Sequence, residues 1–165
     1  MATNKAPWVR NLGGAAQPFR ILVAVAAGSS QAIKKGEICK ISNPGQSNEA
    51  AAPVSGASDN TNLVVCDREQ KADDKARMIE FIVPRPDDEF EFALDSARAV
   101  AVGETFAISD SETLTYATSN VVARQSSDQN APNPSENDTT RRSASKAHVC
   151  FAEGASYWAA INGNS

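Results

Sequence analysis

The chain has 165 residues, a formal net charge of −4 and a sequence pI of about 5.0. Its content of 41% hydrophobic and 22% charged residues is typical of a globular protein and too apolar for a fully disordered chain. Because the acidic balance and the scattered basic residues create no strong positive field, we expect neither nucleic acid nor an anionic membrane as a partner. The longest apolar run, residues 21–27, is far too short to span a bilayer.

The N-terminal segment, residues 1–18, is of mixed polarity and contains Gly13-Gly14 and one large aromatic residue, Trp8. It follows neither the period of a strand nor that of a helix, so we expect an extended arm, and the arm lacks the apolar core of a signal peptide. From Phe19 the sequence becomes rich in apolar and β-branched residues, and "FRILVAV" predicts a buried strand. Residues 19–165 are therefore expected to form one β-domain.

A sequence pattern that predicts a turn followed by a strand occurs twice, as "KKGEICKIS" at 34–42 and as "AVGETFAIS" at 101–109. We call it the repeated phrase. In each copy a glycine, Gly36 or Gly103, can adopt a positive φ and turn the chain before a strand begins. The residues that face inward then correspond in the two copies: Cys39 and Ile41 in the first, Phe106 and Ile108 in the second. Two explanations remain open, an internal duplication and the chance recurrence of a common turn.

The other expected strands follow the same alternation between turn residues and short apolar segments. They are residues 62–67, 77–83, 89–94, 114–119 and 146–152. The segment "SYWAAI" at 156–161 is either a closing strand or a short helical turn, and the alanine-rich residues 96–102 could form one helical turn at most. The spacing of strands without long helical segments predicts an all-β fold, a single antiparallel β-barrel or sandwich.

Residues 124–146 differ in composition from the rest of the chain. Ala131 and Ala144 are the only apolar residues between Arg124 and Lys146, and two prolines in this stretch oppose regular strand pairing. Long polar loops inside compact domains are commonly functional or disordered. We therefore predict a mobile, solvent-exposed loop near the C-terminus.

The residues that could carry chemistry are few. The acidic clusters Asp73-Asp74 and Asp87-Asp88-Glu89 are interpreted as solvated turns, because neither has the spacing of a calcium loop. His148, the only histidine of the sequence, alternates with Cys150 as two metal ligands would, but no further ligands are evident. The three cysteines Cys39, Cys66 and Cys150 are interpreted as reduced and buried. We expect no enzymatic activity, no cofactor and no bound metal.

The order of these segments resembles that of tailed-bacteriophage capsid decoration proteins, also called cement or head-stabilising proteins. The resemblance covers residues 19–123 and rests on the apolar strand, the Gly36-Glu37 turn, "LVVCDREQKADDKARMIEFIV" and the Gly103-Glu104 turn. It implies a β-rich structural protein of the virion, made in the host cytoplasm, that binds the outside of the head. It also implies the major capsid protein as partner and a homo-oligomer, a trimer on a three-fold axis.

If the chain is such a protein, the N-terminal arm is expected to add a strand to a capsid sheet. The expected capsid contacts are then Pro7, Trp8, Val9 and Arg10, with Trp8 as the main anchor. The alternative is that Trp8 folds back onto its own barrel. Two other functions also remain open: another virion part, such as a head-fibre base or a tail β-module, and a ligand- or glycan-binding β-sandwich.

Overall fold

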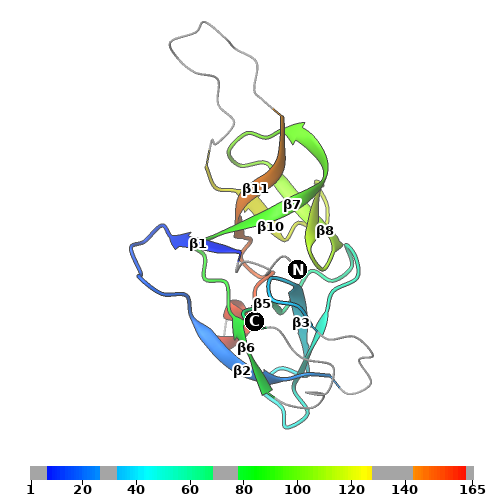
Figure 1. Ribbon diagram of the computed structural model, residues 1–165. Coiled ribbons are helices and arrows are strands. Elements are labelled where there is room, and N and C mark those ends of the chain that lie inside the picture. Colours follow the sequence, from blue (N-terminus) through cyan, green and yellow to red (C-terminus); the bar gives the residue numbers. More distant parts are fainter. Residues whose placement is uncertain (1–6, 27–32, 69–77, 128–142, 163–165) are drawn as a thin grey trace, which may run out of the picture.

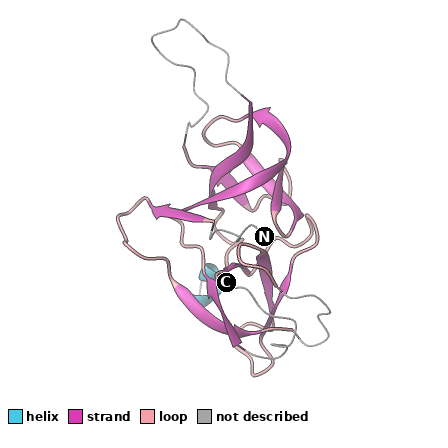
Figure 2. Ribbon diagram, in the orientation of Figure 1, coloured by secondary structure: helices cyan, strands magenta, loops and turns pink. Residues whose placement is uncertain are grey.

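The computed structural model describes residues 7–26, 33–68, 78–127 and 143–162 (Figure 1). This part of the chain is nearly all β, with one short helix (Figure 2), so the predicted fold class is confirmed. The strands and the helix are β1 (Trp8–Asn11), β2 (Arg20–Ala24), β3 (Ile38–Ser42), β4 (Ala50–Pro53), β5 (Leu63–Cys66), β6 (Met78–Ile82), β7 (Asp88–Ala99), β8 (Thr105–Asp110), β9 (Thr113–Tyr116), β10 (Ala123–Gln125), β11 (Ser143–Phe151) and α1 (Tyr157–Ile161).

The strands form a closed five-stranded barrel and a second antiparallel sheet. The barrel runs β7-β11-β10-β8-β9, and the parallel pair β7–β9 closes it. The second sheet has the order β2-β6-β5-β3-β4, and a parallel bridge between Val25 and Ala51 links its two ends. β1 is an additional strand of the sheet that forms the barrel, and it pairs antiparallel with the start of β7 (Figure 1).

The barrel and the second sheet have the same topology. If the strands β2–β6 and β7–β11 are each numbered one to five along the chain, both have the spatial order 1-5-4-2-3. In both, the first strand meets the third in parallel, while the other neighbours pair antiparallel. We call β2–β6 the first unit and β7–β11 the second unit.

The repeated phrase occupies the same place in each unit, before the second strand. Gly36 and Gly103 have φ of 96° and 89°, as the sequence predicts. Gly36 donates its backbone N–H to Cys66 at 2.8 Å, and Gly103 donates to Gln125 at 3.0 Å. The return bonds also match, from Cys66 to Glu37 at 2.9 Å and from Gln125 to Glu104 at 2.8 Å. Chance recurrence of a turn does not explain shared topology and shared bonds, so an internal duplication is favoured.

The positive φ of Gly103 leads to a testable expectation. A Cβ at this position would have open space around it, so any cost of Gly103→Ala arises from the backbone alone. We expect the substitution to lower the free energy of unfolding by about 1 kcal/mol. Gly56 is the matched control, because it has equally open space without a positive φ. Urea titrations in which both alanine variants behave alike would contradict this explanation.

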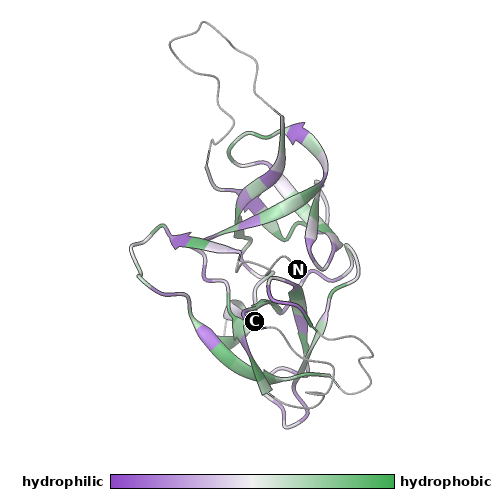
Figure 3. Ribbon diagram, viewed as in Figure 1, coloured by the Kyte–Doolittle hydropathy of each residue, from purple (hydrophilic) through white to green (hydrophobic). Residues whose placement is uncertain are grey.

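Two clusters of buried hydrophobic residues hold the fold together. One lies inside the first unit and includes Val23, Cys39 and Phe81. The other joins the units, because Ile38 and other residues of the first unit pack with Phe90 and the barrel interior. Burying both faces requires apolar residues at successive positions, and β5 is accordingly buried along its whole length. On β7, whose outer face is more polar, hydrophobic and hydrophilic residues alternate (Figure 3).

Several expected elements differ in the structure. The alanine-rich residues 96–102 are not a helical turn, because β7 continues to Ala99. Of the two options for 156–161, the helical one is found, and Ser156 caps α1 by accepting a hydrogen bond from the Trp158 N–H. The polar segment 124–146 is shorter than expected, since β10 ends at Gln125 and β11 begins at Ser143. The remaining prediction of a mobile loop falls largely on residues 128–142, which lie outside the described residues.

Candidate functional site

The predicted capsid contacts lie on and beside β1, and the structure divides them into two pairs. Pro7 is buried, and Trp8 packs against the hydrophobic cluster that joins the units. Val9 and Arg10 are exposed to solvent. The expectation that this segment lies apart from the core is therefore wrong for Trp8, and the alternative, in which Trp8 folds back onto its own barrel, describes its position.

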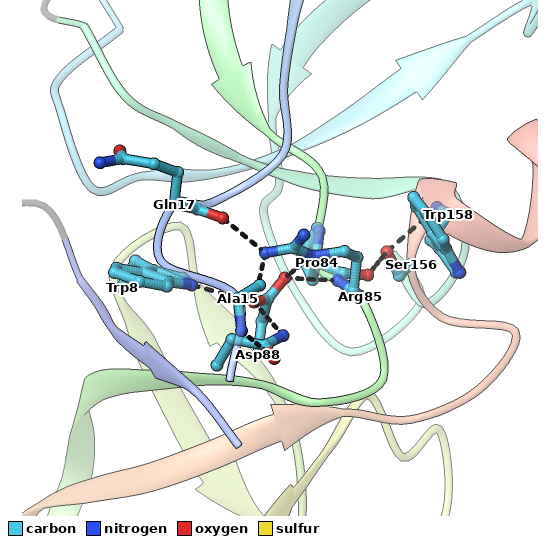
Figure 4. A network of polar contacts seen from close by, with 9 residues as sticks. Trp8, Ala15, Gln17, Pro84, Arg85, Asp88, Ser156 and Trp158 are labelled. Carbon is cyan, nitrogen blue, oxygen red and sulfur yellow. Dashed lines mark hydrogen bonds and ion pairs between the residues drawn. The ribbon is translucent and has the colours of Figure 1, made fainter. Parts of the chain in front are cut away.

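Asp88, at the start of β7, is the centre of a polar network that fixes β1 (Figure 4). Its carboxylate accepts hydrogen bonds from the Trp8 indole Nε1 and the Asn11 side chain, each at 3.0 Å. Arg85 contacts the same carboxylate at 2.9–3.1 Å through its backbone N–H and its guanidinium group. The guanidinium also donates to the Gln17 carbonyl at 2.8 Å. One fully buried carboxylate thus joins β1, the segment after it and the connection between the units.

The pKa of Asp88 is below the usual aspartate value. Burial alone would raise this pKa, but the hydrogen bonds from Arg85, Asn11 and Trp8 favour the ionised form more strongly. An acid whose pKa is lowered on folding stabilises the protein above its unfolded pKa, about 3.9, and loses this contribution as the pH falls through the folded value.

We therefore expect the unfolding free energies of Asp88→Asn and the wild type to be most similar at acidic pH. The difference in unfolding free energy between the two should be full near neutral pH and should shrink below about pH 4. Denaturant titrations at a series of pH values measure it. Asp87→Asn, at the exposed neighbouring residue, is the control and should follow the wild type throughout. A difference between wild type and Asp88→Asn that does not change with pH would contradict the assignment.

Glu89 is a second buried carboxylate beside β1. Only 1% of the residue is exposed, although its acidic cluster was interpreted as a solvated turn. Arg10 forms an ion pair with it through Nε at 3.2 Å, and Ser126 donates its hydroxyl at 2.6 Å. Arg10, one of the predicted capsid contacts, thus has a carboxylate partner within its own chain.

His148 and Cys150 lie at alternate positions of β11, where both are half-buried, as the predicted alternation implies. The His148 Nε2 lies 2.9 Å from Glu91, and this hydrogen bond is the main cause of the lowered pKa of Glu91. Burial raises the pKa of the Cys150 thiol to about 11, so the thiol is not activated as a nucleophile. Among the residues that the structure describes, no group of three or more His, Cys, Asp or Glu side chains could hold a metal ion.

The other two cysteines are buried in the core of the first unit. Burial raises the pKa of Cys66 to about 12 and that of Cys39 well above its usual value, which fits their interpretation as reduced, unreactive thiols. Of the predicted acidic clusters, Asp73-Asp74 lies outside the described residues. In the other, Asp87 is exposed as expected, whereas Asp88 and Glu89 are buried.

A groove of about 580 Å³ runs beside β1, between the barrel and the turn that contains Gly36. Its lining combines apolar surface from Trp8 and Val9 with charges of both signs. The charged and titratable residues are Lys35, Glu91, Glu112, Lys146 and His148. Such a mixed surface can bind a polar ligand or an extended peptide.

None of the known protein-family models matches the chain, and no curated protein or solved structure is significantly similar to it. Within the described part of the chain, no helix is long and apolar enough to cross a membrane. The function is therefore inferred from the two matching β-units and from the contacts that Asp88 and Glu89 make within the chain.

Proposed function

We propose that the chain is a structural, non-enzymatic virion protein that binds the outside of a phage head and stabilises the capsid. The main support is that the two Gly-Glu turns behind the resemblance to decoration proteins open the second strand of two matching units. A chain with two similar units joined by one core can contact a repeating shell at more than one place. Modest affinity at each contact then suffices for firm attachment.

Among the predicted contacts, the exposed residues Val9 and Arg10 are the part of β1 that is available to the major capsid protein. Val9 is 40% exposed, and the Arg10 side chain is 60% exposed although its Nε contacts Glu89. Pro7 and Trp8 act on attachment indirectly, by holding this strand in place.

Co-sedimentation with intact heads tests the proposal. The labelled protein should band with purified heads in a density gradient, and Val9→Glu should weaken this association without a change in melting temperature. Glu112→Gln, at another exposed residue that lines the groove, serves as a surface control. Protein that remains at the top of the gradient, under conditions in which heads stay intact, would contradict the proposal. Association with tails alone would favour the other virion part instead.

The groove supports a second candidate, the binding of a ligand or glycan. Ligand pockets combine aromatic surface with a few polar groups, and Trp8, Lys35 and Glu91 all line the groove. A glycan array distinguishes this function. Specific binding that is lost in Glu91→Gln would favour it over attachment to heads.

A further inference from the structure

Because the two units share their strand order, each strand edge of the first unit has an equivalent edge in the second unit. Val25 bridges to β4 in parallel, as Leu94 of the second unit does to β9. Three residues earlier in each strand lie Leu22 and Glu91, which are therefore equivalent. The equivalence holds on the other side of the strand as well, where Leu22 pairs with β6 and Glu91 with β11.

The edge that contains Glu91 is covered in the second unit. Glu91 donates its backbone N–H to the Pro7 carbonyl at 2.8 Å, and β1 continues antiparallel along Asp88–Phe90. In the first unit, the described residues place no strand against the equivalent edge before the bridge at Val25. β2 thus presents an edge of the kind that β1 covers on β7.

The backbone groups of β2 alternate between its two neighbours. Val83 donates to the Phe19 carbonyl, so Phe19 and every second residue after it bond to β6. Arg20 and Leu22 therefore direct their N–H and C=O groups toward the open edge, whereas the parallel bridge between Val25 and Ala51 places β4 beside Ala24. Ala26, which continues this series, donates to Ala51 of β4 at 2.9 Å and confirms the direction.

Arg20 is the one charged side chain among residues 20–24, and its guanidinium group forms an ion pair with Asp67 of its own chain. Residues 20–24 contain no proline or lysine, and their pairing with β6 has no bulge. Leu22 is 58% exposed and Met78, on the neighbouring strand, is 57% exposed. β1, the edge strand of the other sheet, is protected by comparison, because its pairing is interrupted by a bulge between Trp8 and Arg10.

We propose that this edge binds a second copy of the chain, with β2 of each copy pairing antiparallel about a two-fold axis at Ile21. The residues that point to the open edge would then meet in two pairs, Arg20 with the second copy's Leu22 in both directions. Each leucine covers the aliphatic stem of the opposing arginine, and no like charges lie opposite one another. The contact is isologous, and it joins two sheets of the first unit into one.

The second copy is favoured because the edge is complementary to itself. An antiparallel pair is also the arrangement that β1 makes on the equivalent edge of β7. The trimer implied by the resemblance would instead require a head-to-tail contact, so the mass of the assembly separates the two. The inference does not depend on the proposed attachment to heads.

Sedimentation equilibrium over a dilution series tests the proposal with three variants. The wild type should shift from monomer to dimer as its concentration rises. Leu22→Pro should remain monomeric at all concentrations with little change in melting temperature, because its missing N–H faces the open edge rather than β6. Val23→Pro, which removes an N–H directed to β6, should instead destabilise the fold strongly. Leu22→Lys, which places two like charges opposite each other, should also abolish the dimer.

A wild type that is monomeric at every concentration would overturn the proposal, as would a dimer or trimer unaffected by both Leu22→Pro and Leu22→Lys. If Leu22→Pro fails to fold, Leu22→Lys decides alone. Head binding by the monomeric variants measures the proposed function separately, so failure of one proposal is not failure of the other.

Discussion

Replacing Asp88 with alanine is expected to lower the free energy of unfolding by about 3–5 kcal/mol, because it removes one partner of a buried ion pair. The Arg85 guanidinium group, the Trp8 indole and the Asn11 amide would all lose their shared acceptor. Each donor is then left to find a new partner at the junction of β1 and β7. The variant should unfold at a much lower urea concentration than the wild type.

Asp87→Ala is the matched control, because it removes the same type of side chain from the neighbouring, exposed position. Surface substitutions of this kind usually change stability by about 0.5 kcal/mol or less. If Asp88→Ala and Asp87→Ala had similar midpoints, the network would not hold the fold together.

Trp8→Ala is expected to lower the free energy of unfolding by about 2–3 kcal/mol, because it removes core contacts and a donor to Asp88. If Trp8 were a free anchor for a partner, as the sequence suggested, the melting temperature would not change. Thermal unfolding of the isolated protein therefore separates the two roles directly.

Val9→Ala provides the comparison for Trp8, since it truncates the adjacent exposed residue on the same strand. Its melting temperature should remain close to that of the wild type. A Trp8→Ala variant as stable as Val9→Ala would show that the contacts of Trp8 contribute nothing to the fold. We would then return to the anchor hypothesis.

Local patterns predicted most of the β-structure. The alternation of Phe90 and Phe92 with glutamates identified β7, and the glycines at 36 and 103 identified the turns before β3 and β8. β4 was missed because its sequence is "AAAP", in which neither alternation nor β-branched residues are present. It becomes a strand through pairing with β3, which no local pattern encodes.

The polar network around Asp88 could not be predicted either, because its contacts join residues that are distant in the sequence. Trp8 and Asp88 are 80 positions apart, and three adjacent acidic residues are indistinguishable in a local window. Asp88 and Glu89 are buried where β1 pairs with the start of β7, whereas the adjacent Asp87 is exposed. The duplication had a sequence signal in the repeated phrase, but its full extent required the strand order, because other equivalent positions such as Leu22 and Glu91 differ in chemistry.

Single-particle reconstruction of heads, assembled with and without this chain, tests the proposed function most directly. The proposal predicts additional density on the outer surface of the shell, large enough for two adjoining β-units in each copy, and heads without the chain should be less resistant to heating. Identical maps of the two kinds of head, or density for the chain in the tail alone, would contradict it.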